Sequence, residues 1–558
     1  MTRDKTDKRG KPEKRADAGT PDALVPRRRL GIILTLLFLL PAAGHVVYFH
    51  FAVPVLPYDD AFIGYRYVDN ALAGRGLVYN EGERVMGCTS PLHLGWVAGW
   101  KTVLPGVETP TLAVRSNLIP YLATAAAIYL IALRAGAGAL WSPALAFVFL
   151  TQQHMLRISS GGMESFLFTA FAGFSLVAIA DRRAVLTGAL IGLAMLTRPE
   201  AIVLVPLAVI RFAREPRRLL ACAAVCAIPV AAWVAFAWAY FGTPVPHSIV
   251  AKSIPVFPLA PGHAYGNVAK CTVRWMTDVG AVPLVFDNPL TRAIGVAEVF
   301  RGHAPFVVVV LALAAAWFPA VRRSGAYRPG VAYGLCVALY ARGNPMLFEW
   351  YLPALFVLGL LGVALPLIGL GALLKTRLAV TAAARPRLLH RGVMAARLVG
   401  IVWLGFVAMA DLTLSKRFWT AYVAEEEPTR VRIIAYRTAA QAMNGHLKPG
   451  DRVAASEIGA LGYYLNARIL DGVGLVSPKA LPFHPVPRDQ RPGPGFGMIP
   501  GGLVETERPE WIVSMPTFAD LSLFRRPWFD AAYAPWAAVS LPEPLWGSNE
   551  ILIYRRRQ

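Results

Sequence analysis

Long apolar runs separated by short polar segments occupy most of the chain. Such runs predict helices that cross a membrane, for which a straight span needs about 20 apolar residues. We expect eleven of them, at residues 30–53, 111–133, 142–156, 163–180, 184–196, 201–213, 219–241, 304–321, 329–341, 350–374 and 398–414. Several are shorter than a straight span, including the two on either side of the polar segment Thr197-Arg198-Pro199-Glu200.

The pattern changes at about residue 415 to that of a soluble domain. An amphipathic helix is expected over 427–447 and a loop over the Pro/Gly-rich residues 482–502. Short strands are expected at 452–456, 469–471, 511–514 and 551–554. The prediction is an α-helical polytopic membrane protein, with a transmembrane domain at 30–414 and a small α/β domain at 415–558. The polar residues 1–29 are expected to form a disordered basic tail.

The composition is also typical of a membrane protein. The 558 residues are 56% hydrophobic and only 16% charged. A formal net charge of +22 could indicate nucleic-acid binding, but no recognition motif accompanies it. The basic residues instead gather in short segments between apolar runs, as they do in cytoplasmic loops. We therefore expect a lipid bilayer, and no nucleic acid, as a partner.

These basic segments predict the orientation of the chain. With a cytoplasmic N-terminus, the inner loops contain Arg134, Arg182, Arg183, Arg214, Arg217, Arg218, Arg322, Arg323, Arg328, Lys375, Arg377, Arg385, Arg387 and Arg391. Positive residues accumulate on the cytoplasmic side of an inner membrane. The loops 54–102 and 242–303 and the C-terminal domain are therefore expected outside, with an amphipathic helix in the second loop.

Five cysteines are present. Cys222, Cys226 and Cys336 lie in apolar runs and are expected to be small core residues. Cys88 and Cys271 lie in the two predicted outer loops, so a disulfide between them stays open. No Cys/His spacing typical of a metal site occurs.

Two adjacent carboxylates, Asp59 and Asp60, follow the first apolar run. Like charges side by side raise the pKa of one member, and a general base or a cation ligand is made in this way. A helix N-cap would account for one of the pair but not for both. We predict that Asp59 or Asp60 is catalytic, with Tyr58 and Tyr65 as substrate contacts. No metal ligand is assigned, although the pair would hold Mg²⁺, Mn²⁺ or Ca²⁺ if a divalent cation is used.

Five basic side chains lie on the predicted outer side, namely Arg66, Arg157, Arg198, His247 and Lys252. Together they are candidates for holding a phosphate leaving group opposite the carboxylates, because arginine forks and lysine point charges bind phosphate. Each one alone is better explained as an anchor at the membrane interface.

Three acidic and two aromatic residues are further candidates for substrate contact. Glu164 and Glu200 each fall in the first turn of an expected helix, where a negative charge also favours the helix dipole. Glu349, Trp350 and Tyr351 lie at the outer end of an apolar run. Aromatic belts account for Trp350 and Tyr351 at this depth, whereas Glu349 is less expected there.

Several motifs resemble the GT-C membrane glycosyltransferases, and in particular their terminal β-arabinofuranosyltransferase (AftB-like) branch. The motifs are Tyr58-Asp59-Asp60-Ala61-Phe62-Ile63, Gly74-Arg75-Gly76-Leu77-Val78-Tyr79-Asn80, Thr89-Ser90-Pro91-Leu92, Gly161-Gly162-Met163-Glu164, Leu196-Thr197-Arg198-Pro199-Glu200, Phe241-Gly242-Thr243-Pro244-Val245-Pro246 and Glu457-Ile458-Gly459-Ala460-Leu461-Gly462-Tyr463-Tyr464. The resemblance runs from about residue 30 to 480. It implies a GT-C fold, a polyprenyl-phosphate sugar donor and a catalytic aspartate in the first external loop, which points to Asp59 and Asp60.

The expected function is transfer of a sugar, with arabinofuranose as a candidate, to a cell-envelope glycan or glycolipid on the outer side of the membrane. The soluble domain would hold the acceptor. A transporter or flippase for lipid-linked sugars is one alternative, since it too would carry intramembrane charges. It would not need an adjacent aspartate pair in a long external loop. A non-catalytic subunit of an envelope assembly complex is another alternative.

Overall fold

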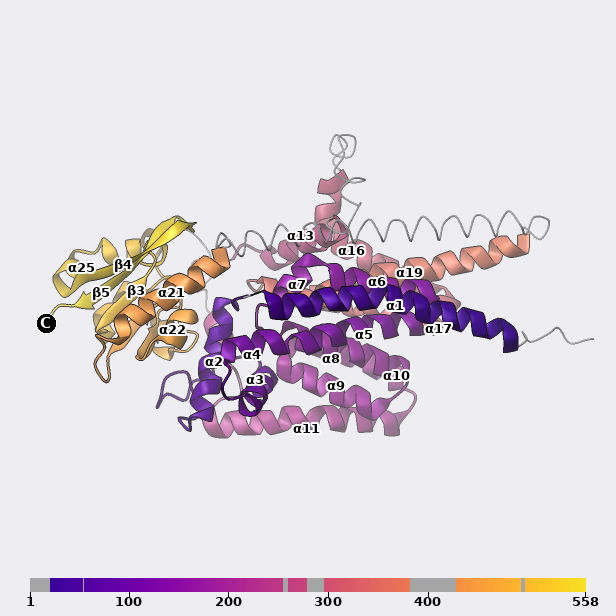
Figure 1. Ribbon diagram of the computed structural model, residues 1–558, viewed down its shortest axis with the longest axis horizontal. Coiled ribbons are helices and arrows are strands. Elements are labelled where there is room, and N and C mark those ends of the chain that lie inside the picture. The colour runs from indigo at the N-terminus through magenta and orange to yellow at the C-terminus, as the bar shows by residue number, and fades with distance from the viewer. Residues whose placement is uncertain (1–20, 54, 254–258, 278–295, 382–427, 493–496) are drawn as a thin grey trace, which may run out of the picture.

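The computed structural model describes residues 21–53, 55–253, 259–277, 296–381, 428–492 and 497–558. A bundle of helices forms the N-terminal part, and a small domain with a β-sheet lies at one end of the bundle (Figure 1). Short helices of the first predicted loop lie where the bundle meets this domain (Figure 1).

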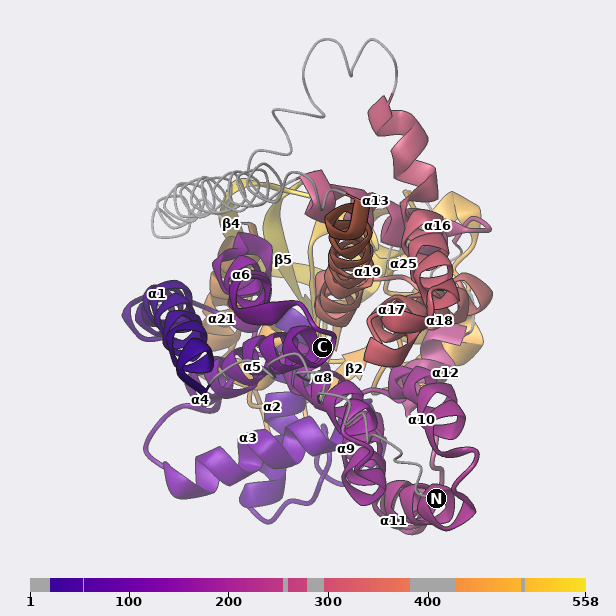
Figure 2. The same cartoon turned by 90° about the vertical axis from the view of Figure 1, so that its right-hand side faces the viewer.

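The helical part contains, in chain order, α1 (Pro21–Ala52), α2 (Asp59–Leu72), α3 (Pro91–Val103), α4 (Thr109–Ser116), α5 (Leu118–Arg134), α6 (Gly138–Thr151), α7 (Gln153–Ser159), α8 (Ser165–Ala180), α9 (Ala184–Thr197), η1 (Pro199–Leu204), α10 (Val205–Phe212), α11 (Pro216–Phe241), α12 (His247–Ser253), α13 (His263–Thr277), α16 (Val296–Trp317), α17 (Pro319–Ser324), α18 (Arg328–Gly343), η2 (Glu349–Tyr351) and α19 (Leu352–Thr381). Seen along the bundle, α1 and α6 lie on one side and α16 and α18 on the other (Figure 2). Apolar side chains from these helices form one large core.

The described helices include several that fit a membrane. Four are long and apolar enough to cross it, at Gly31–Ala52, Thr109–Arg134, Pro216–Phe241 and Glu349–Arg377. Four shorter apolar helices lie at Gly138–Thr151, Ser165–Ala180, Ala184–Thr197 and Pro305–Trp317. The predicted span at 398–414 falls outside the described residues. A helical membrane bundle is therefore confirmed, while the count of eleven spans stays a prediction.

Two predicted spans are interrupted. The span at 142–156 ends as α6 at Thr151, and α7 begins anew after Gln152, whose side chain accepts hydrogen bonds from the amides of His154 and Met155 at 2.6 and 3.2 Å. This is an N-cap, which starts a new helix axis. The span at 201–213 is split into η1 and α10, because Pro206 lacks the amide that would continue the hydrogen-bond ladder.

The ends of the transmembrane domain also differ from expectation. Helix α1 begins at Pro21, so part of the segment predicted as a disordered tail is helical. Proline is tolerated in a first turn, and arginine favours helices.

The amphipathic helix expected in the loop 242–303 is α13, whose Ala264 and Val268 are buried in the bundle core.

The C-terminal domain contains α21 (Pro428–Asn444), β1 (Arg452–Ala455), α22 (Ala460–Tyr464), β2 (Arg468–Asp471), η3 (Pro478–Phe483), η4 (Arg488–Gln490), α23 (Gly501–Glu507), β3 (Trp511–Ser514), α24 (Pro516–Ala519), η5 (Asp520–Phe524), α25 (Pro527–Ala532), β4 (Tyr533–Leu545) and β5 (Ser548–Arg556). The strand order is β2-β1-β3-β5-β4. Strands β1, β2 and β3 are parallel, and β5 pairs antiparallel with both β3 and β4. The predicted helix and the four predicted strands are therefore confirmed.

The sequence pattern missed the edge strand β4. This strand contains Pro535, Pro542 and Pro544 and has two register shifts against β5. Proline is confined to edges and bulges of sheets, so a proline-rich run does not look like a strand in the sequence.

The C-terminal domain and the first loop share a single hydrophobic core. Phe62, Tyr65 and Tyr79 from the loop pack in the same cluster as Tyr436 and Trp511 from the domain. Each of these five side chains is almost fully buried. The two parts predicted as separate units are therefore packed into one body at this end of the molecule.

Candidate active site

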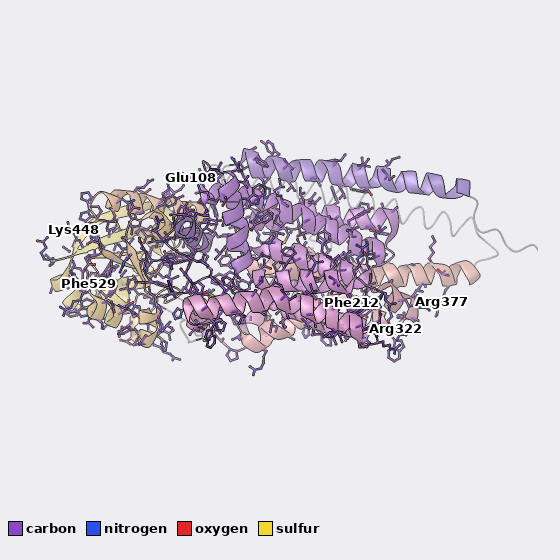
Figure 3. All side chains as sticks on the ribbon, turned by 90° about the horizontal axis from the view of Figure 1, so that it is seen from below. Glu108, Phe212, Arg322, Arg377, Lys448 and Phe529 are labelled. Atoms are coloured by element: carbon purple, nitrogen blue, oxygen red, sulfur yellow. The ribbon has the colours of Figure 1, made fainter. Side chains whose placement is uncertain are left out.

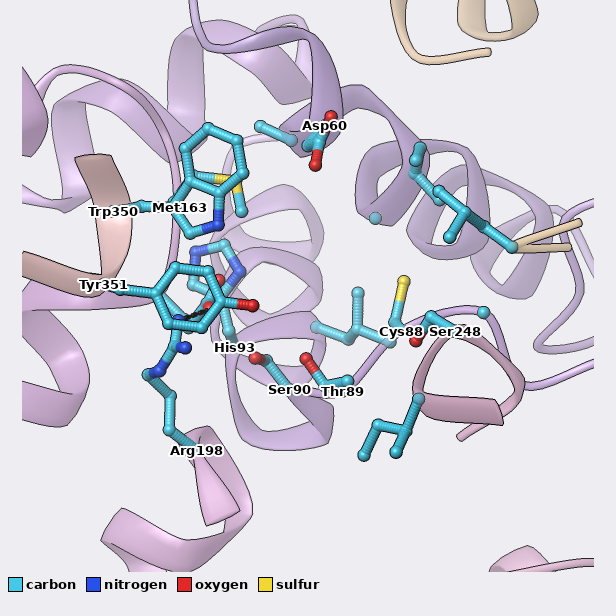
Figure 4. A pocket seen from close by; sticks show the side chains of 18 of the residues that line it. Asp60, Cys88, Thr89, Ser90, His93, Met163, Arg198, Ser248, Trp350 and Tyr351 are labelled. Atoms are coloured by element: carbon cyan, nitrogen blue, oxygen red, sulfur yellow. Dashed lines mark hydrogen bonds and ion pairs between the residues drawn. The ribbon is translucent and has the colours of Figure 1, made fainter. Parts of the chain in front are cut away.

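A cavity of about 140 Å³ lies between the first loop, the bundle and α12 (Figure 4). Of the predicted site residues, six line it. They are Asp60, Glu164, Arg198, Lys252, Trp350 and Tyr351. These residues come from five separate stretches of the chain, so the fold brings together groups that are up to about 290 positions apart in the sequence.

The two adjacent aspartates have different surroundings. Asp59 is buried, and its carboxylate accepts hydrogen bonds from the amides of Gly459 and Ala460 at 3.2 and 2.8 Å. Asp60 is half-buried and faces the cavity. Asp59 thus fixes the C-terminal domain to the start of α2, and Asp60 is the carboxylate that can meet a substrate.

Electrostatics prepare Asp60 for proton transfer. Its removal from water raises the pKa of the carboxyl above 3.8, and the neighbouring charge of Asp59 raises this pKa further. The positive charge of Lys252 acts in the opposite direction and lowers the pKa of Asp60. A carboxylate with a raised pKa is a stronger base, which suits removal of a proton from a hydroxyl group.

Glycines allow the close contact between α2 and α22. A Cβ on Gly459 would overlap the carbonyl of Asp59, and a Cβ on Gly462 would overlap the hydroxyl of Tyr79. Tyr79 uses that hydroxyl to bond the carbonyl of Ile458 at 2.6 Å. Gly459 is the residue before α22 and Gly462 lies within it, so the two glycines let this helix approach both Asp59 and Tyr79.

Arg198 is buried in the cavity wall, and two carboxylates neutralise its positive charge. Its guanidinium pairs with Glu164 at 2.7 Å and with Glu200 at 2.8 Å, and it covers the ring of Tyr351 at 4.0 Å. Glu200 also accepts a hydrogen bond from Tyr340 at 3.2 Å. A buried cation between two carboxylates is well compensated, so this group has little positive charge left for an anion.

Lys252 differs from Arg198 in how its positive charge is compensated. It lies on α12, and its ammonium group is 5.5 Å from the ring centre of Phe348. Phe348 in turn stacks on Trp350, with ring centres 4.7 Å apart. Among the described residues, no ion pair neutralises Lys252, so its charge is available to an anionic group entering the cavity.

Four of the predicted residues lie beside the cavity and support its rim. Glu349 accepts a hydrogen bond from Tyr58 at 2.9 Å and lies 3.7 Å from Arg157. Tyr58 also packs against Trp350, and Tyr65 bonds the carbonyl of Gly162 at 2.9 Å. A Cβ on Gly161 would overlap the Tyr58 ring, and one on Gly162 would overlap the Tyr65 hydroxyl. The Gly161-Gly162 motif thus makes room for these two tyrosines.

Besides Arg157, two further predicted phosphate ligands, Arg66 and His247, lie outside the cavity lining. Arg66 donates to the carbonyls of Tyr79 and Ala467, both at 2.8 Å, and also to that of Gly462. Arg66 thus joins the loop to the C-terminal domain. His247 precedes the cavity residue Ser248 and is held by its own amide, which donates to the carbonyl of Met86 at 2.7 Å.

Sequence reasoning missed several residues of the site. Cys88, Thr89, Ser90, His93 and Ser248 all line the cavity. The motif Thr89-Ser90-Pro91-Leu92 resembles GT-C glycosyltransferases, and His93 follows it directly. The resemblance alone does not assign a role to any of these residues.

The C-terminal domain adds a missed ion pair beside the aspartates. Arg432 pairs with Glu457 at 3.0 Å. Burial raises the pKa of Glu457 to about 7, and the charges of Asp59 and Asp60 raise it as well. The interface behind the cavity is therefore rich in carboxylates, with Arg432 as their nearby counter-charge.

The described part of the chain contains neither a group of residues suited to a metal ion nor a disulfide between Cys88 and Cys271, which the sequence alone left undecided. No group of three His, Cys, Asp or Glu side chains there could hold a metal ion. Asp59 uses its oxygens for backbone amides, so a divalent cation at the aspartate pair stays an untested prediction and no chemical step is assigned to it. Cys88 and Cys271 are not joined by a disulfide.

Comparisons with known proteins place this geometry in a wider context. The structure of ArnT from Cupriavidus metallidurans in the apo state aligns with a TM-score of 0.51 and 14% identity, over 95% of this chain and 98% of that one. The chain has the GT-C fold. ArnT bound to undecaprenyl phosphate aligns with a TM-score of 0.49 and 14% identity, over 96% of this chain and 98% of that one.

Sequence comparison relates this GT-C chain to an arabinofuranosyltransferase. It is 32% identical over 251 residues to the terminal beta-(1->2)-arabinofuranosyltransferase of Mycobacterium tuberculosis. The match covers 40% of this chain and 40% of that relative. A family model described as "Domain of unknown function (DUF8728)" matches residues 422–554, which include most of the C-terminal domain. The predicted resemblance to GT-C enzymes of the arabinofuranosyltransferase type is thus confirmed.

Proposed function

We propose that the protein is a glycosyltransferase that moves a sugar, with arabinofuranose as the first candidate, from a polyprenyl phosphate to a cell-envelope glycan or glycolipid. The observation that carries this proposal is the placement of Asp60 and Lys252 on one cavity. A carboxylate with a raised pKa and an ammonium group without an ion pair among the described residues are available to the same ligand.

The two groups fit the two ends of the reaction. Asp60 takes the proton of an acceptor hydroxyl as its oxygen attacks the anomeric carbon of the donor sugar. The bond from that carbon to the phosphate oxygen breaks, and the phosphate leaves with the bonding electrons. Lys252 stabilises the negative charge that the phosphate gains.

The size of the cavity supports transfer of one sugar unit at a time. Its volume of about 140 Å³ is close to that of cavities of about 150 Å³ that hold a benzene-sized ring. The apolar helices of the bundle would hold the lipid chain within the bilayer, and the C-terminal domain contributes Leu475 to the cavity lining.

Transfer of radiolabelled sugar from polyprenyl-phosphate arabinofuranose to an arabinan acceptor by the purified protein tests the proposal. We expect Asp60→Asn to lose turnover by about 10²-fold or more, the scale of general-base catalysis. Glu81→Gln is the matched control, since Glu81 is an exposed carboxylate of the same loop outside this cavity, and it should keep wild-type turnover.

Movement of lipid-linked sugar across vesicles without any transfer would instead favour a flippase. Wild-type turnover by Asp60→Asn would contradict the base assignment.

A further inference from the structure

Two buried polar atoms of the cavity have no hydrogen-bond partner among the described residues. They are Nε2 of His93 and Oγ of Ser248, whose side chains belong to residues only 7% exposed. Both residues line the cavity. Buried polar groups are nearly always paired, because an unpaired one costs about 1–3 kcal/mol. An unpaired atom that faces a cavity therefore indicates a group that a ligand satisfies.

The other fully buried histidine among the described residues, His50, has both ring nitrogens paired. His50 is 2% exposed, yet its Nδ1 lies 2.9 Å from the carbonyl of Val46 and its Nε2 lies 3.1 Å from the hydroxyl of Ser159. Nε2 of His45 and of His247, which are both half-buried, is unpaired as well in the described part of the chain. Of these three unpaired rings, that of His93 belongs to the residue that lines the cavity, where a ligand can reach it.

The backbone holds both side chains firmly in place. His93 stands in the first turn of α3, where its amide donates to the carbonyl of Ser90 at 3.1 Å, and Ser90 is tied to the carbonyl of Thr197 at 2.7 Å. Ser248 stands in α12, which is tied to the first loop by the amide of His247. The two polar atoms are therefore presented from two fixed elements, as a binding subsite requires.

The chemistry of this pair suits a neutral ligand with hydroxyl groups. Burial lowers the pKa of His93 below 6.5, so its imidazole is uncharged near neutral pH and has one donor and one acceptor nitrogen. A serine hydroxyl both donates and accepts, and so does every hydroxyl of a sugar. The rings of Trp350 and Tyr351 line the same cavity and offer apolar faces to the C–H side of a sugar ring.

We propose that His93 and Ser248 hold the hydroxyl groups of the transferred sugar and so determine which sugar the cavity accepts. This inference rests on the proposed function, in which Asp60 and Lys252 serve the acceptor and the phosphate. It assigns a separate task to His93 and Ser248, namely recognition of the sugar ring itself.

The test compares three lipids that differ in the group attached to the phosphate. Binding of polyprenyl-phosphate arabinofuranose and of bare polyprenyl phosphate to purified protein is measured, together with a hexopyranose-bearing lipid. Wild type should bind one sugar-bearing lipid more tightly than the bare lipid. His93→Ala and Ser248→Ala should each weaken binding of that lipid by about tenfold, the scale of one buried hydrogen bond. Binding of bare polyprenyl phosphate should stay unchanged.

Ser253→Ala is the matched control for Ser248→Ala. Ser253 lies on the same helix but is exposed, and its hydroxyl bonds the carbonyl of Val250 at 2.8 Å. This variant should bind both lipids like wild type. Ser248→Ala should also keep the melting temperature, because it removes an unpaired hydroxyl and leaves no new unpaired group.

Each remaining outcome counts against a specific statement. Equal losses for the sugar-bearing and the bare lipid, or no loss for either, would overturn the sugar subsite and leave the proposed function standing. If wild type binds none of the sugar-bearing lipids more tightly than the bare lipid, the sugar subsite is likewise overturned and the proposed function stands. Failure of wild type to bind any polyprenyl phosphate would overturn the proposed function and this inference with it.

Discussion

At the scale of single residues, two neighbouring aspartates of identical chemistry have different tasks. Successive residues of a helix point about 100° apart, so Asp59 and Asp60 at the start of α2 face different neighbours. The sequence indicated a carboxylate pair but could not say which member faces the substrate, because that depends on where α22 docks. The sequence also could not show that Glu164 and Glu200 neutralise the charge of Arg198, because this depends on how distant segments pack.

The anchoring role of Asp59 predicts a loss of stability in Asp59→Asn. The asparagine NH₂ cannot accept from an amide, so one of the two hydrogen bonds to α22 is lost and a buried donor stays unpaired. We expect the free energy of unfolding to fall by about 1–3 kcal/mol, measured by thermal and denaturant melting in detergent. Asp520→Asn should change little, because its pair with Arg525 is exposed. Wild-type melting combined with lost transfer would make Asp59 catalytic instead.

Lys252→Gln should shift the pH dependence of the reaction. Asp60 must be deprotonated to act as a base, so the rate rises with pH through its pKa. Lys252 lowers that pKa, and its removal should move the acidic limb of kcat to higher pH, measured at saturating donor. The KM for the donor should rise as well, because the phosphate loses its cation. Lys479→Gln, which removes an exposed lysine, is the control.

An unchanged acidic limb together with an unchanged donor KM would show that Lys252 has neither role. It would then be an anchor for lipid head groups, which would affect expression or stability alone.

At the scale of elements, periodicity identified most helices and strands but not their interruptions. The predicted strands at 452–456 and 511–514 correspond to β1 and β3, because apolar runs of this length suit the centre of a sheet. The edge strand β4 and the break before α10 depend on prolines whose effect is decided by the neighbouring elements. Glycines that permit close packing are equally hard to recognise beforehand.

The contact between α2 and α22 predicts a strong effect of Gly459→Ala. The new Cβ would overlap the carbonyl of Asp59, which is backbone and cannot turn aside as the end of a flexible side chain can. We expect a clearly lower melting temperature and lower transfer, since α22 would be pushed away from the start of α2. Gly445→Ala is the control, because a Cβ there meets nothing within 4 Å. Equal melting of the two variants would contradict the docking role of Gly459.

At the scale of the whole molecule, the sequence predicted two units, whereas the structure joins the first loop and the C-terminal domain in one core. A change in composition at about residue 415 marks where the apolar runs end, but it cannot show which surface the following domain covers. The consequence is functional. Asp60, the proposed base, belongs to a helix whose start is held by the C-terminal domain, so that domain helps to position this carboxylate.

The arrangement of the two ends predicts the orientation in the membrane. Lys448 lies in the C-terminal domain, while Arg322 and Arg377 lie toward the opposite end of the molecule (Figure 3). Positive residues at that opposite end favour a cytoplasmic location. In a variant without the five natural cysteines, Lys448→Cys should react with a membrane-impermeant maleimide in intact cells. Arg322→Cys should react only after permeabilisation, with Arg377→Cys as a second probe of the same side.

Reaction of both ends in intact cells would exclude the predicted topology, and with it an outward-facing cavity. Reaction of Arg322→Cys alone in intact cells would indicate the inverted orientation, with the C-terminal domain in the cytoplasm. The carboxylate Asp60 would then face the cytoplasm, because it lies on the side of the C-terminal domain, and an acceptor outside the membrane would be out of its reach. The orientation of the two ends therefore decides in which compartment an acceptor can meet this site.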